Sequence, residues 1–503
     1  MSKYILAHDL GTSGNKATLF DTDGHLVKST VYSYDLITGE NNSAEQRADD
    51  WWRAVCETSK TLVGEVDKND VIAVSFSGQM MGCLCVDKEG TPLHNALIWA
   101  DMRSTKQAEY LKQTIDANSY YSITGHRISA SDSITKLMWI RDNLPDVYKN
   151  TYKMLNAKDY IVFKLTGKFA TEPSDASSTC LLDLNTLSWS DEILAASKLD
   201  KEKLPDLVRS IDVVGGVTPN AARLTSLAAG TPVVCGGGDG CCAAVGTGIV
   251  KEGIANCCLG TSSWISLASK KPVCDKDMAV FNFAHIVPGY IMPCGTMQTG
   301  GGALSWAVNN LYGGLEGYEH FSKNDIYASV GKEVAASDVG AKNLLFLPYL
   351  IGERSPRWNN QAKGTFVGLT LNHTRGDMLR AVMEGVGYNL DIILNIFRSS
   401  GNDINNLILM GGGARNTIWQ EILCDIFGIP VLVPDYLEEA TSMGAAITAG
   451  VGVGAFADFD VVSKFIKINQ ENKPHAGAQE KYKAMKALFD ESYDSLNAIF
   501  NKL

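Results

Sequence analysis

The tetrapeptide Leu-Gly-Thr-Ser occurs at positions 10–13 and again at 259–262, about half the chain apart. Each copy lies between two runs that are rich in β-forming residues, which predicts a hairpin with the tetrapeptide at its turn. Backbone N–H groups and hydroxyls at such a turn point outward and can bind phosphate oxygens. The alternative is that Gly-Thr-Ser only makes a tight turn, since such turns are common. Repetition in matching contexts favours phosphate binding.

Acidic residues accompany these glycine-rich stretches. Asp9 directly precedes the first copy, where a carboxylate cannot contact phosphate favourably but can hold Mg²⁺ or a metal-bound water. Glycine clusters at 236–240 (GGGDG) and 411–413 (GGG) follow strand-like runs, and glycines at a strand's carboxyl end let a ligand approach the backbone. Asp239 is the only charged residue of the first cluster. It can accept a proton from a reacting hydroxyl or, alternatively, cap the following helix.

Two common nucleotide motifs fit the sequence poorly. Gly238, Gly240 and Ala243 match the G-x-G-x-x-A pattern of dinucleotide folds. That fold needs a parallel strand and an acidic residue about 20 positions further on, whereas a hairpin-like segment follows here. The P-loop pattern G-x-x-x-x-G-K-[ST] is absent. Nicotinamide enzymes and Walker-type ATPases are therefore disfavoured.

The elements that position these motifs form two similar halves. A chain of 503 residues is too long for one hydrophobic core. The first half opens with β-type runs at 4–9, 17–21 and 26–34, and a helix follows from Asp49; the second opens with a hairpin at 254–268. Strands alternating with helices predict an α/β fold. We expect two related, packed domains, 1–250 and 251–503, with a cleft between them.

Composition narrows the partners and the compartment. A net charge of −11 makes nucleic acid and anionic membranes unsuitable partners. The chain shows no leader-like start and no apolar run of 18 residues, which argues against a signal peptide or a transmembrane helix. Twelve cysteines include two adjacent pairs and no Cys-x-x-Cys, so buried free thiols are expected rather than disulfides or zinc sites. A cytoplasmic protein is the prediction.

Two longer stretches carry a family resemblance. SDSITKLMWIRDN at 131–143 and GTFVGLTLNHTRGDMLRAVME at 364–384 resemble the two signatures of the FGGY carbohydrate kinases. The resemblance spans the chain from Asp9 to about position 450. It implies two ribonuclease-H-like domains of the actin-like ATPase type flanking a nucleotide cleft, with ATP and Mg²⁺ as cofactors. Lys136 and Trp139 of the first stretch also suit interior scaffold.

The resemblance assigns roles to single residues. Asp239 is implied as the catalytic base, with Asp175 as a competing candidate in a stretch that the family uses structurally. Asp9 and Asp239 are implied to support the metal, largely through water. For Ser305 and Asn416 the alternative is plain surface or capping polarity. The implied nucleotide-binding residues, contributed by both domains, are Gly11, Thr12, Ser13, Lys16, Gly260, Thr261, Ser262, Gly301, Ser305, Gly412, Gly413 and Asn416.

The acceptor pocket is expected in the first domain. Within the family, the motifs look most like those of xylulokinases, which carry Gln-Met-His-Gly and Gly-Gly-Gly-Asp-Asn. Here Met81 replaces the histidine and Gly240 the asparagine, so two groups that could read a sugar hydroxyl are lost. D-xylulose is the first expectation, and other ketopentoses, erythritol, gluconate and related polyols stay open. The implied acceptor residues are Gln79, Met80, Met81, Trp99, Asp101 and Asp239.

A second class of function also stays open. The chain could be a non-catalytic sugar sensor or an actin-like ATPase that changes a partner's conformation. The presence of Asp239 and of both tetrapeptides argues against a sensor. Glycerol is disfavoured because the Arg-Glu pair that glycerol kinases place after the equivalent glutamine is missing. A homodimer is the default assembly for a symmetric cytosolic enzyme.

Overall fold

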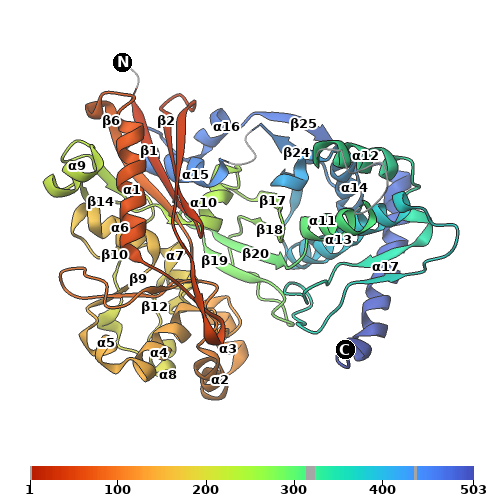
Figure 1. Cartoon of the computed structure of the whole chain (residues 1–503), viewed down its shortest axis with the longest axis horizontal. Helices are drawn as coiled ribbons and strands as arrows, with labels where there is room; N and C mark the ends of the chain where they lie inside the picture. Colours follow the sequence, from red (N-terminus) through yellow and green to blue (C-terminus); the bar gives the residue numbers. More distant parts are fainter. Residues whose placement is uncertain (1–2, 313–322, 436–438) are drawn as a thin grey trace.

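A computed structural model describes residues 3–312, 323–435 and 439–503. A mixed sheet forms the centre of the first half, with strand order β14-β15-β6-β1-β2-β3 and β16 beside β6 (Figure 1). Strands β1, β6 and β15 run parallel, while β2 and β3 continue from β1 as an antiparallel hairpin series. The strands are β1 (Tyr4–Leu10), β2 (Gly14–Asp21), β3 (Leu26–Ser33), β6 (Val71–Gly78), β14 (Val213–Gly216), β15 (Pro232–Val234) and β16 (Gly237–Gly238).

The second half repeats this plan. Its sheet has the order β19-β20-β18-β17-β23-β24-β25. Strand β17 pairs antiparallel with β18 and parallel with β23, as β1 pairs with β2 and β6. The strands are β17 (Gly253–Leu259), β18 (Ser263–Leu267), β19 (Phe281–Ala284), β20 (Ile291–Met297), β23 (Ile404–Met410), β24 (Val431–Pro434) and β25 (Ile468–Asn472).

The repeated topology confirms the predicted pair of related α/β units. Both tetrapeptides lie in the tight connections between the first two antiparallel strands, since Leu10 pairs with Asn15 and Leu259 with Ser263. Burial along β1 and β17 is nearly continuous, as expected for central strands that are covered on both faces. The predicted hairpins are therefore present in both halves.

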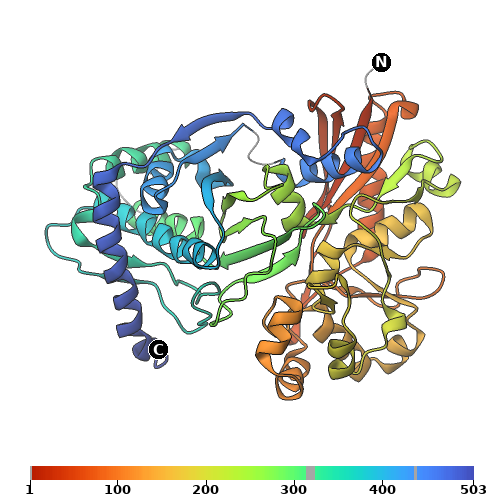
Figure 2. The ribbon, with the colours of Figure 1, turned by 180° about the vertical axis from the view of Figure 1, so that it is seen from behind.

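Helices cover the sheets. In the first half, α1 (Ala48–Val63) lies on β2 and β3 and buries Trp51, Val55 and Leu62 at helical spacing. In the second half, the buried α13 (Arg375–Ser399) contacts α11 (Gly301–Tyr312), α12 (Lys323–Ala335), α14 (Thr417–Phe427) and α17 (Ala476–Phe500). Figure 2 shows α17 along the outer side of this half. Helix α13 is the central helix of its core.

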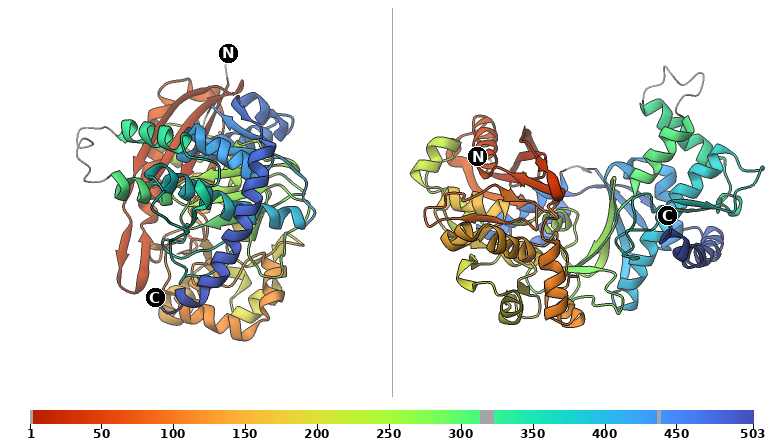
Figure 3. Two further views of the ribbon diagram at one scale, coloured as in Figure 1. Left: turned by 90° about the vertical axis from the view of Figure 1, so that its right-hand side faces the viewer. Right: turned by 60° about the horizontal axis from the view of Figure 1, so that its bottom comes forward.

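A pair of glycine-containing helices joins the halves. Helix α10 (Asp239–Gly246) packs closely on α15 (Ala440–Gly452), and glycine permits this approach. A Cβ at Gly246 would lie only 1.8 Å from the Ala440 carbonyl oxygen, and one at Gly444 only 1.9 Å from the Cys242 carbonyl oxygen. Helix α15 also contacts β1 and β6 (Figure 3). The chain order divides near 250, but α15 returns to the first sheet, so the two units interlock.

The remaining elements mostly build the lower part of the first half, as viewed in Figure 1. The short strands are β4 (Ile37–Gly39), β5 (Ser43–Gln46), β7 (Leu84–Val86), β8 (Ala96–Leu97), β9 (Lys153–Leu155), β10 (Ala170–Thr171), β11 (Leu182–Asp183), β12 (Ser188–Trp189), β13 (Asp206–Leu207), β21 (Leu345–Leu347) and β22 (Thr365–Val367). The helices are α2 (Thr105–Thr114), α3 (Ala117–Thr124), α4 (Ser133–Asn143), α5 (Pro145–Asn150), α6 (Ala157–Thr166), α7 (Pro173–Ser178), α8 (Asp191–Ser197), α9 (Pro219–Thr225) and α16 (Val462–Phe465).

The cysteines agree with the sequence prediction. All twelve are free, and all except Cys258 and Cys274 are buried. Burial raises the pKa of most of these thiols, for example that of Cys294 to about 12, which keeps them protonated. None of the helices in the described residues is both long enough and apolar enough to span a bilayer.

Candidate functional site

Strand pairing brings the two predicted acids to one edge of the first sheet. Asp9 of β1 is the register partner of Ser77 in β6, and Gly78 pairs with Gly238, which directly precedes Asp239. Burial raises the pKa of Asp9 to about 7, and the negative charge of Asp239 adds to that rise. The Ser77 hydroxyl donates to Asp9 Oδ1 at 2.9 Å, and this hydrogen bond limits the rise in the pKa of Asp9. Two half-buried carboxylates therefore share this strand-end site.

The GGGDG segment needs its glycines to reach this position. Gly236 has φ +78°, and a Cβ there would lie 2.0 Å from the Phe76 carbonyl oxygen of β6. A Cβ at Gly238 would lie 2.6 Å from Met80 Sδ. A side chain at Gly236 would therefore push the segment away from β6, and one at Gly238 would displace the Met80 side chain. The glycines let Asp239 follow immediately after the strand end.

Asp239 is the first residue of α10 and is not its N-cap, which is Gly238. Its Oδ1 accepts a hydrogen bond from the Gly240 N–H at 2.7 Å. Burial raises the pKa of Asp239 to about 6, and that hydrogen bond limits the rise. A carboxylate with a pKa near the operating pH is suited to general-base work. The capping alternative therefore does not describe this residue.

The first tetrapeptide is anchored by side chains. The Tyr34 hydroxyl donates to the Gly11 carbonyl at 2.5 Å, and Gln46 Nε2 donates to the Thr12 carbonyl at 2.6 Å. These bonds turn the loop's carbonyls toward the protein. Trp99 Nε1 donates to Thr12 Oγ1 at 2.9 Å. A predicted phosphate residue and a predicted acceptor residue are thus in direct contact, while Ser13 beside them is exposed.

The second tetrapeptide is anchored by a helix. The Gly301 N–H, at the start of α11, donates to the Gly260 carbonyl at 2.7 Å, and the Gly300 and Gly302 N–H groups both donate to the Thr261 carbonyl at 3.0 Å. A Cβ at Gly301 would lie 2.6 Å from the Gly260 carbonyl oxygen. The side chains of Thr261 and its neighbour Ser262 are exposed. The loop and the N-terminus of α11 therefore form one rigid unit.

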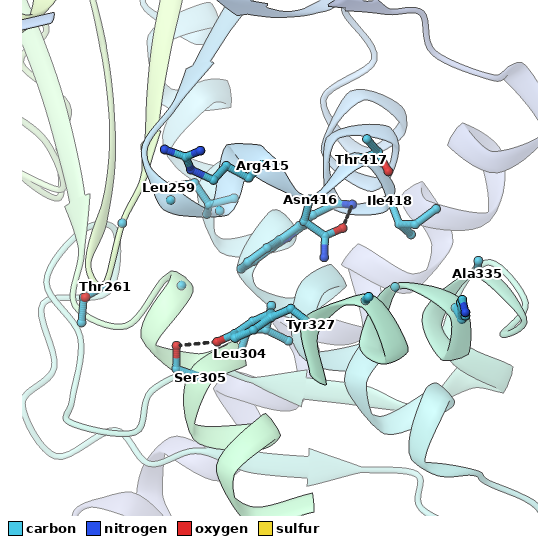
Figure 4. Close-up of a pocket in the computed structure, with 18 residues that line it drawn as sticks. Leu259, Thr261, Leu304, Ser305, Tyr327, Ala335, Arg415, Asn416, Thr417 and Ile418 are labelled. Atoms are coloured by element: carbon cyan, nitrogen blue, oxygen red, sulfur yellow. Dashed lines mark hydrogen bonds between the residues drawn. The ribbon is translucent and has the colours of Figure 1, made fainter. Parts of the chain in front are cut away.

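A pocket of about 1060 Å³ opens beside this unit (Figure 4). It brings together seven of the twelve predicted nucleotide residues from three separate segments. The first segment is the second tetrapeptide, the next is the start of α11, and the last is the turn after β23. The seven residues are Gly260, Thr261, Gly301, Ser305, Gly412, Gly413 and Asn416.

Asn416 and Ser305 each make a bond beside this pocket. Asn416 is the N-cap of α14, and its Oδ1 accepts from the Trp419 N–H at 3.0 Å, so the capping alternative holds for that oxygen. Ser305 Oγ lies 3.3 Å from the hydroxyl of Tyr327. Figure 4 shows both side chains on the wall of the pocket. Each residue combines a local bond with a place on the pocket wall.

Sequence reasoning missed one wall of this pocket. Tyr327, Lys332 and Ala335 of α12 line it, together with Arg415 and Trp419. The segment 323–335 reads as an ordinary helix without glycine motifs. Its place in the pocket comes from packing of α12 against α13 and α14, which no local pattern signals.

A salt bridge joins the two halves at the edge of the first loop. Lys16 of β2 is the register partner of Asp9, and its Nζ lies 2.6 Å from Glu439 Oε1, which directly precedes α15. Glu439 was not predicted as a site residue. The negative charge of Glu439 also raises the pKa of Asp9, and Lys16 lowers it. Charges from both halves therefore meet around the first tetrapeptide.

The donor set suits a metal held through water. Among the residues described by the structure, no three or more His, Cys, Asp or Glu side chains converge to bind a metal ion directly. The negative charge of Asp239 makes ionisation of Asp9 more costly and contributes to the raised pKa of Asp9. A divalent cation beside them would offset that repulsion. The pair fits Mg²⁺ that enters already bound to a nucleotide.

Met81 is held in an unusual backbone conformation. It has φ +63°, and its N–H donates to Ser178 Oγ at 3.0 Å while its carbonyl accepts from Lys136 Nζ at 2.8 Å. Lys136 is fully buried, as its scaffold alternative predicts. These two bonds hold the left-handed conformation. Lys136 thereby helps to position Met81, an expected acceptor residue, through its backbone.

Two expected acceptor residues differ in exposure: Asp101 is fully buried, whereas Trp99 is 40% exposed. The Asp101 carboxylate is fully buried and accepts hydrogen bonds from the Ala44 N–H at 2.8 Å and from Arg103 Nε at 2.9 Å. Arg103 also bonds Glu45 at 2.7 Å. Asp101 therefore orients the segment that carries Trp99 rather than offering an open oxygen to a ligand.

Asp175, the competing base candidate, belongs to a buried network under the GGGDG segment. Lys158 Nζ lies 3.3 Å from Asp175 Oδ2, and both side chains are fully buried. Ser174 Oγ donates to Glu172 at 2.6 Å and accepts from the Gly238 N–H at 3.0 Å. Asn156 Nδ2 also donates to Asp175 Oδ1 at 2.7 Å, so the Asp175 carboxylate is already occupied by Lys158 and Asn156. The network instead supports the residue that precedes Asp239.

Known proteins match nearly the whole chain. The model of the FGGY family of carbohydrate kinases, N-terminal domain, matches residues 4–246, and the C-terminal domain model matches 255–453. The chain is 31% identical over 492 residues to the xylulose kinase of Staphylococcus xylosus, covering 98% of this chain and 100% of that one. Identity to the xylulose kinase of Bacillus subtilis (strain 168) is 32% over 494 residues, covering 98% and 97%. The crystal structure of gluconate kinase from Lactobacillus acidophilus aligns over 100% of both chains with a TM-score of 0.92 and 26% identity.

Proposed function

The chain belongs to the FGGY family of carbohydrate kinases, which makes it an ATP-dependent sugar kinase, and we propose that its acceptor is D-xylulose and its product D-xylulose 5-phosphate. The support for this sugar is that the relatives from Staphylococcus xylosus and Bacillus subtilis are xylulose kinases. The observation that carries the chemistry is Asp239, a half-buried carboxylate with a pKa of about 6 beside Asp9.

Asp239 is proposed as the general base. The acceptor hydroxyl transfers its proton to Asp239 while its oxygen forms a bond to the γ-phosphorus of ATP. The bond from that phosphorus to the β–γ bridging oxygen breaks, and ADP leaves with this oxygen. Catalysis of this transfer depends mainly on positioning and charge stabilisation. The network under Gly238 holds the base in place for it.

The two tetrapeptides are proposed to hold the phosphates from opposite walls. Thr12, Ser13 and Lys16 face the transferring phosphate, and Thr261 and Ser262 face the other side. When bound with ATP, Mg²⁺ neutralises charge on the phosphate oxygens, and Asp9 and Asp239 would hold it through water. The 1060 Å³ pocket next to the second tetrapeptide accommodates the adenosine. Domain closure around the nucleotide then completes the site.

The acceptor wall favours a neutral sugar over gluconate. A gluconate carboxylate needs a cation, and two cations that contact expected acceptor residues are already engaged: Lys136 bonds the Met81 carbonyl and Arg103 bonds Asp101. Gluconate stays the second candidate because of the fold match to gluconate kinase. We place the activity in the cytoplasm, since many buried free thiols suit a reducing compartment.

A panel assay tests the proposal. ATP turnover is measured with D-xylulose, D-ribulose, erythritol, gluconate and glycerol, and without acceptor. We expect turnover to depend on the acceptor and kcat/KM to be highest for D-xylulose, within about 10²-fold of its best competitor because Met81 and Gly240 lack hydrogen-bonding side chains. Equal turnover with and without every sugar would identify an ATPase instead. A preference for gluconate would replace the proposed acceptor.

A further inference from the structure

Trp51, Gln46 and Gln79 form a buried hydrogen-bond chain behind the first tetrapeptide. The Trp51 indole Nε1 donates to Gln46 Oε1 at 3.0 Å, and Gln79 Nε2 donates to the same oxygen at 2.7 Å. Gln46 Nε2 donates to the Thr12 carbonyl at 2.6 Å. The three side chains are at most 3% exposed. The chain thus joins helix α1, the end of β6 and the first loop.

The partners of Gln46 allow only one orientation of its amide. An indole N–H can only donate, and a backbone carbonyl can only accept. A flipped amide would set its oxygen against the Thr12 carbonyl and its NH₂ group against the indole N–H. Leaving such groups buried and unpaired is costly, because each loses its hydrogen bonds to water and gains none in the protein. Gln46 Oε1 is therefore fixed toward Trp51 and Gln79.

This orientation fixes the next amide in turn. Because Gln46 offers an oxygen, Gln79 must present its NH₂ group to it. Gln79 Nε2 also lies 3.4 Å from the Gly11 carbonyl oxygen, a second acceptor on the same side. The side-chain oxygen of Gln79, Oε1, therefore points away from Gln46 and from the Gly11 carbonyl. The orientation of the Gln79 amide thus follows from the Trp51 indole, which can only donate and acts through Gln46.

Gln79 Oε1 is buried and has no hydrogen-bond partner within the described part of the protein. Buried acceptors are usually paired, so an unpaired one needs an explanation. The Gln79 N–H donates to the Leu10 carbonyl, and the next residue, Met80, packs on Gly238 beside Asp239. The unpaired oxygen belongs to a residue set between the first loop and the proposed base.

We propose that Gln79 Oε1 accepts a hydrogen bond from a hydroxyl of the sugar, and that Gln46 is the positioning residue that fixes this polarity. The inference rests on the proposed kinase function and adds a rule for the acceptor. The group opposite Gln79 must be an O–H donor. A carbonyl, an ether or a carboxylate at that place would face the oxygen with its own lone pairs. Gln79 thereby supplies selectivity that Met81 and Gly240 cannot.

Monofluorinated sugars test this rule. The best acceptor is compared with analogues in which each hydroxyl that is not phosphorylated is replaced in turn by fluorine, which is of similar size but donates no hydrogen bond. With the natural protein, we expect one analogue to lose at least about 10²-fold in kcat/KM, since sites built around a hydroxyl reject analogues that lack it. The other analogues should lose less than about tenfold.

Three Gln→Leu variants assign that loss. In Gln79→Leu, the sensitive analogue and its parent should react at rates within about tenfold, because the acceptor oxygen is gone. In Gln46→Leu, the kcat/KM values of the parent sugar and the sensitive analogue should also become more similar, because the amide of Gln79 can then flip. Gln107→Leu is the matched control: Gln107 is buried, its Nε2 bonds Asp142, and its Oε1 is likewise unpaired in the described structure. That variant should keep the same difference in kcat/KM between the parent sugar and the sensitive analogue as the natural protein.

The results separate the inference from the function it rests on. If the natural protein phosphorylates the parent sugar but tolerates every fluorinated analogue within about tenfold, the inference is overturned and the kinase stands. The same holds if Gln79→Leu keeps the loss undiminished. If no sugar is phosphorylated at all, the proposed acceptor class and this inference fall together. The analogue series on the natural protein needs no variant to fold.

Discussion

The two Leu-Gly-Thr-Ser loops share their residues and their hairpin, but they are anchored differently. Side chains of Tyr34 and Gln46 hold the carbonyls of the first loop, and Trp99 bonds its threonine hydroxyl. Backbone N–H groups at the start of α11 hold the carbonyls of the second. The first loop is thus tied to expected acceptor residues, and the second to the wall of the proposed nucleotide pocket.

This difference assigns separate tasks to two similar domains. A repeated fold supplies two equivalent turns, and we propose that the surrounding side chains make one sensitive to the sugar and the other to the nucleotide. The titrating acids Asp9 and Asp239 both lie with the first loop. Changes near the first loop should therefore alter chemistry and acceptor use, and changes near the second should alter nucleotide use alone.

The largest effect is expected at the base of the first half. Asp239→Asn should lower kcat by at least about 10²-fold, the usual scale for a positioned base. The amide keeps the size of the side chain, so the KM for ATP should change less than about threefold. Steady-state kinetics with D-xylulose and ATP measure both. Near-normal phosphorylation by this variant would remove Asp239 from the role of base.

A steric change should isolate the second loop. In Gly301→Ala the new Cβ would lie 2.6 Å from the backbone oxygen of Gly260, so the loop and α11 must separate. We expect the KM for ATP to rise at least about tenfold while the KM for the sugar stays within about twofold. Gly477→Ala, where no atom lies within 4 Å of the new Cβ, is the control. A matching rise in both KM values would break the proposed division of tasks.

Activity should fall on the acid side because the base must be ionised. Burial raises the pKa of Asp239 to about 6 and that of Asp9 to about 7, so both take up protons as the pH falls. At pH 5 about a tenth of Asp239 would be ionised, which lowers kcat/KM for the sugar about tenfold relative to its plateau. A pH profile of kcat/KM tests this. A constant value from pH 5 to 8 would contradict it.

Matched threonine variants give the smallest and most direct contrast. Thr12→Val loses the acceptor of the Trp99 indole N–H, so it should raise the KM values for ATP and for the sugar, each about fivefold. Thr261→Val should raise only the KM for ATP. Comparing the four KM values tests the asymmetry of the loops. Identical effects of the two variants would show that the loops are equivalent.

Local patterns predicted much of this arrangement. Runs of β-forming residues on either side of turn residues predicted both hairpins, and glycine runs at strand ends predicted where Asp239 and Gly412 lie. Contacts between distant segments were not predictable. Glu439 reaches Lys16 only because α15 returns to the first sheet, and Gln46 matters only through its bonds to Gln79 and Thr12. Neither residue carries a local signal for those contacts.

The central claim is that the two loops, from different halves, hold one nucleotide. Small-angle X-ray scattering with a non-hydrolysable ATP analogue plus D-xylulose tests it most directly, because gripping from both walls draws the halves together. The account predicts a smaller radius of gyration for the natural protein at saturating ligands and a weaker response for Gly301→Ala. Unchanged dimensions of the natural protein, with both ligands shown to be bound, would contradict it.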